Sequence, residues 1–368
     1  MRLTSLLLFL LALPGCRAHQ TYFRGVDRSL FDSELEEMSA ELSSDLSAQT
    51  VVKPTPVEQF KRLEPVAITS KGFQGRAEWS PDGDSVVFQS ARGAGPAANR
   101  WEQTYLMGAD GSNQRLITTG TGKTHGAVFI PGTDSLVVAY GSTHRLGVTP
   151  AREALAVGDS ADHEMDLVRH DLTEGKVDTL VGGPGFDGEP HFCRDGRTLA
   201  FTSARTGDLE VYILGPRGIP LPITSHPGPD ESPRLSPDCT EVVWVRRLEV
   251  GSDLVLAQAN GTQPRTLLSS QASLHTPSFS PDGNHVLFAS DLAAPGGQLD
   301  LFAVHRSGQD VRRITFSDGS ERTPRLSPDG RRLLFSADGE GSPQLYVAPF
   351  RATEGTPWSI PQRDGSTP

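Results

Sequence analysis

The chain has 368 residues, of which 36% are hydrophobic, and its 34 basic and 45 acidic side chains give a net charge of -11. That length and composition are sufficient for a large buried core. Because a surface that follows phosphates is normally basic, the acidic balance argues against nucleic acid as a partner. The 38 glycines and 28 prolines favour many tight turns over long helices.

The N-terminus has the features of an exported, lipid-modified protein. Arg2 precedes an apolar run from Leu6 to Leu13 that is too short to span a bilayer. The run ends in Leu13-Pro14-Gly15-Cys16, which resembles a bacterial lipobox. This resemblance implies that residues 1–15 are a signal peptide, that Cys16 is lipidated, and that Arg17 directs the protein to the outer membrane. The alternative is an ordinary signal peptide with an incidental cysteine.

Residues 27–46 predict an acidic amphipathic helix. Apolar residues recur there at steps of three or four, namely Phe31, Leu35, Met38, Leu42 and Leu46. Acidic residues fill the other face and argue against binding to anionic lipid. We expect a short helix that packs on the folded domain, with a partner-binding helix and a disordered segment as alternatives. Lys53-Pro54-Thr55-Pro56 breaks this helix, so we assign 16–64 to a lipidated tether.

The strongest signal downstream is a turn that recurs about every 43 to 63 residues. Its proline fixes φ, its aspartate bonds to the local backbone, and its glycine takes the left-handed conformation. Clear copies begin at Ser80, Ser236, Ser280 and Ser327, a degenerate copy at Cys193, and a weaker one at Ile130. Each turn is followed by an apolar or alternating strand such as Ser85-Val86-Val87-Phe88.

Four strands per repeat and six repeats predict an all-β fold, a six-bladed β-propeller over residues 65–351 with a C-terminal tail at 352–368. The last blade shows three obvious strands. We expect Pro65 to Thr69 to supply its fourth strand, because closure removes an exposed edge. Thr356 to Ile360 is the rival, although Pro357 within it disfavours a strand.

These Ser-Pro-Asp-Gly repeats resemble the WD40-like propeller repeat of TolB and its relatives, from Pro65 to Phe350. The stretches Gly185-Phe186-Asp187-Gly188-Glu189 and Gly141-Ser142-Thr143-His144 resemble one subgroup of periplasmic propellers. The chain has no room for the separate N-terminal α/β domain of TolB. The resemblance therefore implies a TolB-like disc that is distinct from TolB itself, and it is specific for fold rather than function.

Two cysteines fall within the repeats. Cys193 and Cys239 lie in corresponding turns of neighbouring blades, which we expect to be too far apart for a disulfide. Cys239 also replaces the turn glycine of the fourth blade, which costs about 1 kcal/mol if the left-handed geometry is kept.

In such propellers the loop before each innermost strand faces one mouth of the central channel, and we expect the candidate site residues to lie in these loops. They are Gln74, Arg76, His125, Asp187, Glu189, Asp230, Glu231, His275, Glu321 and Arg322. Their charges suit a peptide or glycan site, or a solvated funnel whose charges pair with one another. We expect no cofactor. A divalent cation held by two histidines and carboxylates is the alternative, although no compact ligand spacing supports it.

A long insertion in the second blade, from Gly141 to His163, carries His144 and His163 and predicts a partner-binding loop or a plain surface loop. The chain has no Gly-x-Ser-x-Gly elbow, phosphate-binding loop or Cys-x-x-Cys pair. The leading hypothesis is a non-catalytic module, a monomeric propeller that binds an envelope protein or peptide. A carbohydrate lyase or hydrolase with His125 and His275 among carboxylates is the alternative, and a purely structural spacer is a third.

Overall fold

The computed structural model describes residues 64–70, 74–92, 102–118, 122–133, 136–143, 164–294, 296–339, 341–350 and 356–357. The predicted signal peptide, the lipidation site Cys16, the acidic helix and the C-terminal tail beyond 357 lie outside these residues. So do His144 and His163 of the insertion. Among the described residues, none forms a helix long and apolar enough to cross a membrane.

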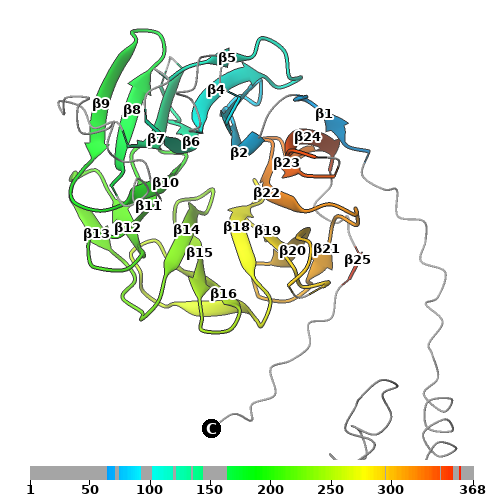
Figure 1. The fold of residues 1–368 in the computed structure, drawn as a ribbon. Coiled ribbons are helices and arrows are strands. Elements are labelled where there is room, and N and C mark those ends of the chain that lie inside the picture. The colour runs from blue at the N-terminus through cyan, green and yellow to red at the C-terminus, as the bar shows by residue number, and fades with distance from the viewer. Residues whose placement is uncertain are drawn as a thin grey trace, which may run out of the picture. The chain divides into compact units, whose positions relative to one another are not determined.

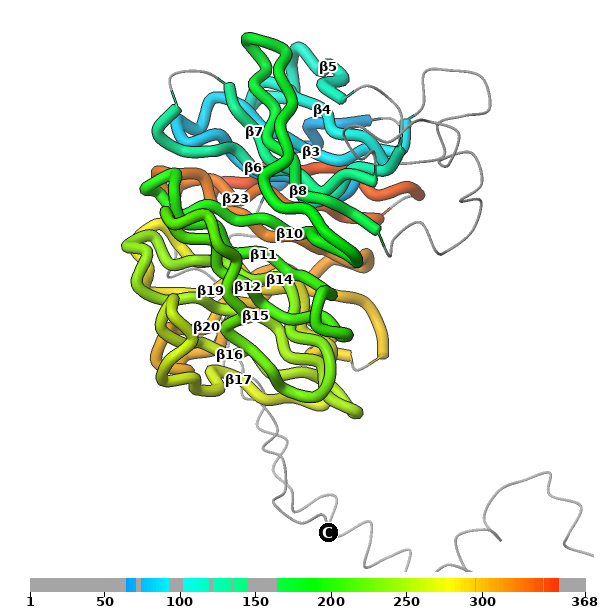
Figure 2. Tube along the Cα trace, turned by 90° about the vertical axis from the view of Figure 1, so that its left-hand side faces the viewer, coloured from blue at the N-terminus to red at the C-terminus, as the bar shows by residue number. Residues whose placement is uncertain are grey.

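Six antiparallel sheets surround a central axis in the described part of the chain (Figure 1). Figure 2 shows the same ring from the side. The first three blades, from the innermost strand outwards, are β2 (Gln74–Trp79), β3 (Ser85–Ser90), β4 (Gln103–Gly108) and β5 (Arg115–Leu116); β6 (Thr124–Phe129), β7 (Val137–Ser142), β8 (Asp166–Asp171) and β9 (Lys176–Val181); and β10 (Asp187–Phe192), β11 (Leu199–Ser203), β12 (Glu210–Leu214) and β13 (Pro220–Pro222).

The last three blades follow the same plan. They are β14 (Asp230–Leu235), β15 (Glu241–Arg247), β16 (Ser252–Gln258) and β17 (Arg265–Ser270); β18 (Leu274–Phe279), β19 (His285–Ser290), β20 (Asp300–His305) and β21 (Arg312–Arg313); and β22 (Glu321–Leu326), β23 (Arg332–Ala337), β24 (Gln344–Pro349) and β1 (Val66–Ala67). The predicted six-bladed propeller is therefore confirmed.

The N-terminal strand closes the ring, as expected. Val66 pairs with Val347 and Ala67 with Tyr346, so β1 is the outer strand of the last blade. The rival segment contributes β25 (Thr356–Pro357), which pairs with β21 and adds a fifth strand to the preceding blade.

The repeated turn has the local bonds that its sequence predicts. In the first blade, the Ser80 hydroxyl donates to an Asp82 carboxylate oxygen at 2.5 Å, and the same oxygen accepts from the backbone N–H of Asp84 at 3.0 Å. Gly83 takes a φ of 79° and its N–H donates to the Ser80 carbonyl at 2.9 Å. Each copy thereby reverses the chain between the first and second strands of a blade.

Apolar side chains fill the space between adjacent blades. Phe288 of the fifth blade, for example, belongs to one buried cluster with Val243 and Leu254 of the fourth. Phe88, Phe201 and Phe288 occupy the same place on the second strands of three blades, and all are fully buried. Burying such a side chain stabilises the fold by about 1.5–3 kcal/mol, and it fixes each innermost strand against the axis.

The expectation that Cys193 and Cys239 stay apart is wrong. They form a disulfide with a Cα–Cα distance of 5.7 Å. The glycine position of each turn lies against the preceding blade's turn: a Cβ at Gly83 would stand 3.3 Å from Pro328. Cys239 occupies that glycine position, with a φ of 64°, and Cys193 lies in the turn before it. Turns at the inner ends of neighbouring blades are therefore close enough for a disulfide.

Candidate functional site

Each innermost strand carries a β-bulge at the same place. In β18, His275 pairs with Ala289, whereas the next pair is Ser278 with Leu287, and the other five innermost strands shift register identically. The third residue of five of these strands has a positive φ, including Glu189 at 54° and Thr276 at 46°. A left-handed backbone conformation is costly for residues other than glycine, yet the bulge recurs in every innermost strand. We infer that the bulge directs side chains toward the axis.

At one end of the channel, an ion pair crosses from the first blade to the third. Arg76 Nη2 lies 2.5 Å from Glu189 Oε1. Glu189 also accepts from the Thr202 hydroxyl at 2.9 Å, from the Ser232 N–H at 2.7 Å and from the Ser232 hydroxyl at 3.0 Å. Burial alone would raise the pKa of Glu189, but Arg76, His125 and these hydrogen bonds lower it to about 2. Glu189 is thus ionised, and its contacts join the first, third and fourth blades.

A second group at this end joins the fourth and fifth blades. Arg247 lies 2.5 Å from Glu231 Oε1, and its Nη2 is 3.0 Å from His275 Nδ1. Burial and the charge of Glu189 raise the pKa of Glu231. Burial, Arg247 and Arg322 lower the pKa of His275 to about 4. The imidazole is therefore neutral at pH 7 and lies beside cations.

The remaining predicted residues at this end differ in exposure. His125 Nδ1 is 3.8 Å from Glu102 Oε2, a partner that the sequence did not single out. Burial alone would raise the pKa of Glu102, yet His125, Lys123 and Arg76 lower it. Arg322 is exposed. The Arg322 side chain is therefore free to contact a ligand in solution, whereas His125 is part of an interblade pair with Glu102.

Two of the predicted residues, Asp187 and Asp230, bond within their own blades, whereas Glu321 bonds to a residue that follows the outer strand of the preceding blade. Asp187 accepts a bidentate bond from Arg205, with oxygens 2.7 and 2.9 Å from Nη2. Asp230 accepts from Arg246 at 3.0 Å and from the Trp244 indole N–H at 2.9 Å. Glu321 accepts from the Thr315 hydroxyl at 2.9 Å.

Each of these carboxylates is the first residue of its innermost strand, and each is at most 2% exposed. The contacts of Asp187 and Asp230 bind the strands of one blade together, whereas that of Glu321 links the sixth blade to the end of the fifth.

The described residues hold one group of three potential metal ligands whose donor atoms all lie within 4.8 Å, namely Cys193, Asp195 and Cys239. Both thiols of that group form the disulfide. The predicted histidines are not part of it: His125 faces Glu102, whereas His275 is beside Arg247. The arrangement of these described side chains therefore resembles a network of paired charges more than a cation site.

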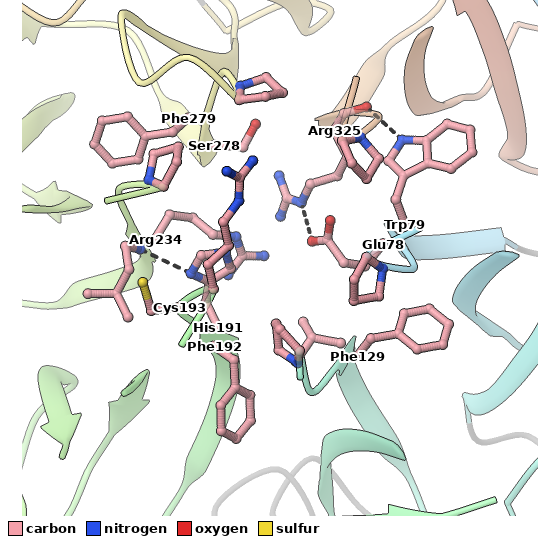
Figure 3. A pocket seen from close by; sticks show the side chains of 18 of the residues that line it. Glu78, Trp79, Phe129, His191, Phe192, Cys193, Arg234, Ser278, Phe279 and Arg325 are labelled. Atoms are coloured by element: carbon pink, nitrogen blue, oxygen red, sulfur yellow. Dashed lines mark hydrogen bonds and ion pairs between the residues drawn. The ribbon is translucent and has the colours of Figure 1, made fainter. Parts of the chain in front are cut away.

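The opposite end of the channel opens into a cavity of about 450 Å³ (Figure 3). It is surrounded by the repeated turns, which contribute prolines from five blades, and by the ends of the innermost strands. Apolar lining comes from Trp79, Phe129, Phe192 and Phe279. A concave, largely apolar space with a few fixed polar groups is typical of a binding site.

The fifth residue of each innermost strand lines this cavity, and all of these residues except one are polar. The six residues are Glu78, Val128, His191, Arg234, Ser278 and Arg325, which we call the inner ring. Arg325 Nε donates to Glu78 Oε2 at 2.9 Å. His191 Nδ1 accepts from the Leu235 backbone N–H at 3.0 Å. Figure 3 shows Arg234 and the Arg325–Glu78 pair on different sides of the cavity.

The inner ring was not among the predicted site residues, although the sequence contains a signal for it. Pro-Arg-Leu-Ser-Pro-Asp occurs twice, at 233–238 and at 324–329. The arginine precedes the turn serine by two residues in both copies. Because strand residues alternate between faces, this position faces away from the leucine that follows it, which is buried at 235 and half-buried at 326.

Comparisons with known proteins agree with this architecture. Residues 220–366 match a family model described as the TolB beta propeller domain. An uncharacterized protein of Agrobacterium fabrum is 25% identical over 169 residues, which cover 43% of this chain and 58% of that protein. The chain thus spans less than two thirds of this relative's length.

Solved structures show the same fold. TolB from Acinetobacter baumannii superposes with a TM-score of 0.55 at 16% identity, over 75% of this chain and 65% of that chain. A putative TolB from Agrobacterium tumefaciens gives 0.56 at 16%, over 77% and 92%. An oligogalacturonate lyase in complex with manganese gives 0.51 at 14%, over 78% and 93%. With the closed six-bladed ring, these findings show that the chain has the fold of TolB-like β-propellers and that residues 220–366 match the TolB beta propeller domain.

Proposed function

We propose that this protein is a non-catalytic binding module of the bacterial cell envelope, whose propeller channel binds a segment of a protein or a peptide. The lipobox-like sequence around Cys16 supports a lipid anchor, and Arg17 supports an outer-membrane location facing the periplasm. The likeness of the fold to TolB supports an envelope setting. In this proposal, residues 16–64 tether a rigid propeller to the membrane.

The observation that carries the proposal is the cavity at the turn end of the channel. Its volume of about 450 Å³ lies within the range of ordinary ligand sites, about 300–1,000 Å³. Proline and aromatic side chains form its wall, and such surfaces bury an extended segment without large changes of their own shape. The first end of the channel has mostly paired charges, and in this proposal the exposed Arg322 contacts a longer ligand that passes along the axis.

A photo-crosslinking experiment on the full chain tests the proposed surface. Arg194 lies in the lining of the cavity and is exposed, so a photoreactive amino acid there reports on bound partners. Arg217 is also exposed but belongs to the connection between β12 and β13, and it serves as the matched control. We expect envelope proteins to crosslink at position 194 and to be competed away by excess unlabelled chain. Equal labelling at both positions would contradict binding in the channel.

The anchor is tested separately. Cys16→Ser should abolish incorporation of labelled palmitate and release the protein from the membrane fraction, because the thiol is the proposed site of acylation. A Cys16→Ser variant that still fractionates with membranes would show that the lipobox resemblance is incidental.

The alternative is a carbohydrate lyase or hydrolase. It is favoured by the presence of His125 and His275 at one end of the channel and by the fold likeness to an oligogalacturonate lyase. The lowered pKa of His275 and its contact with Arg247 disfavour a cation at that nitrogen. Metal analysis combined with turnover assays on pectic and envelope polysaccharides distinguishes the two functions. Turnover that is lost in His125→Ala would establish the enzyme.

A further inference from the structure

The inner ring contains more positive than negative charge. Arg234 and Arg325 supply two cations, and Glu78 is the single carboxylate among the six residues. Both guanidinium groups are deeply buried, with exposures of 6% for Arg234 and 4% for Arg325. A buried charge without a counter-charge costs several kcal/mol. The ring therefore has one excess positive charge, which one further anion would neutralise.

The two arginines differ in how far their donors are satisfied. Arg325 bonds to Glu78, and its Nη1 donates to the Pro324 carbonyl at 2.7 Å. Among the described residues, Arg234 has one hydrogen-bond acceptor, the Pro233 carbonyl, which accepts from Nη1 at 3.0 Å. Its Nε is buried and has no acceptor among the described residues, none of whose carboxylates lies within salt-bridge distance of Arg234. A guanidinium has five N–H donors, so Arg234 has donors, the buried Nε among them, that no described residue uses.

Arg234 is nevertheless charged at neutral pH. Burial lowers its pKa, the positive charge of Arg325 lowers it further, and together they bring it to about 9. This value remains above neutrality. The same surroundings that penalise the charge also exclude water, so they strengthen any ion pair that forms there.

His191 provides a neutral donor on the same ring. Its Nδ1 accepts from the Leu235 N–H, so the ring proton must be on Nε2 in the neutral form. Burial, Arg234 and Arg325 hold the pKa of His191 well below its usual value, which keeps the imidazole neutral. The side chain lies beside Arg234 in the cavity (Figure 3).

We propose that the inner ring binds a carboxylate group, with Arg234 as its principal ion-pair partner and Arg325 and His191 as supporting donors. This inference rests on the proposed function, because it names the chemistry of the peptide in the channel: a free C-terminus or an acidic side chain. A planar, singly charged carboxylate matches the forked donors of an arginine and neutralises the one excess positive charge. A phosphate dianion would exceed that charge.

Three pools of pentapeptides distinguish the possible sources of the carboxylate. The first has free C-termini and no Asp or Glu, the second is amidated and lacks Asp and Glu, and the third is amidated and contains them. Affinity selection on the full chain should retain peptides from the first or third pool but not from the second. The retained pool shows whether the C-terminus or a side chain is recognised.

Variants connect the selection to the inner ring. Arg234→Gln should weaken binding of a retained peptide by at least about 30-fold, because an ionised partner would lose its buried counter-charge. Arg217→Gln removes an exposed arginine outside the cavity and should change affinity by less than about twofold. Retention of the second pool equal to the others, or unchanged binding in Arg234→Gln, would overturn the carboxylate site while leaving peptide binding intact.

Thermal melts test the ring without a peptide. Sodium acetate should raise the melting temperature of the wild type above that in sodium chloride of equal ionic strength, and Arg234→Gln should lose this difference. Arg217→Gln should keep it. If no peptide pool is retained but the acetate effect is present, the proposed function is wrong and the carboxylate site stands. A larger effect of inorganic phosphate than of acetate would overturn the choice of a carboxylate.

Discussion

Removing the disulfide between Cys193 and Cys239 should cost the propeller about 3 kcal/mol of unfolding free energy. The informative variant is Cys193→Ser with Cys239→Gly, because it restores the serine and glycine that other copies of the turn carry. The two cysteines are 46 residues apart in sequence. Closing a loop of that length lowers the chain entropy of the unfolded state and stabilises the fold by about 4 kcal/mol at 25 °C.

Part of this loss is offset at the turn itself. Cys239 has a φ of 64°, and glycine adopts that conformation about 1 kcal/mol more easily. The net change corresponds to a melting temperature about 5 °C lower for a domain of roughly 300 residues.

Urea titrations of the wild type and the double variant, each with and without reductant, measure the effect. Reductant should bring the wild type close to the variant and leave the variant unchanged, with thiol counting to confirm complete reduction. A double variant as stable as the oxidised wild type would refute the argument, because the loop-closure contribution would then be absent. A wild type unaffected by verified reduction would refute it as well.

Other residues give predictions of known sign. The pKa of Glu189 is about 2 against an ordinary 4.5, so Glu189→Gln should lose about 3 kcal/mol of stability at pH 7. Urea titrations at several pH values should show this gap closing as pH falls from 4.5 toward 2. Burial is the main cause that raises the pKa of Glu321 to about 7. Protonated Glu321 favours the fold, and this contribution to stability is present below pH 4.5 and lost as the pH rises through 7. Glu321→Gln should therefore be more stable than the wild type at pH 8, by up to about 3 kcal/mol. Near pH 4 the two proteins should be equally stable. A Cβ at Gly196 would lie 2.1 Å from the Pro131 carbonyl oxygen, whereas one at Gly175 meets no described atom within 4 Å, and both have a positive φ. Gly196→Ala should therefore lower the melting temperature clearly more than Gly175→Ala, which should cost about 1 kcal/mol.

The fold was predictable because its information is local and repeated. Each Ser-Pro-Asp-Gly turn contains the groups that form its own bonds, as in Ser80 and Asp82, and the apolar strand after it has one possible buried environment. Ring closure by β1 followed from the missing strand of the last blade. Information of this kind survives even where single copies are degenerate.

The site was less predictable because it depends on distances between blades. Sequence position alone placed Asp187 and Glu189 together, yet Asp187 bonds within its blade and Glu189 crosses the channel to Arg76. The bulge between Gly188 and His191 changes the direction of the Glu189 side chain, and no residue type marks it uniquely. The disulfide was missed for a related reason, because blades that are separate at the rim converge at the axis.

The pairing of β1 with β24 also determines when the propeller can complete its folding. Val66 is synthesised early, but its partner Val347 follows 281 residues later (347 minus 66). At about 5–20 residues per second, translation separates the two by about 15–55 s. During that interval the last blade lacks its outer strand, and the ring lacks the contact that joins its two ends. The protein is thus committed to finishing its chain before it can finish its fold, and a chain shortened by a few strands at its C-terminus would leave β1 without a partner.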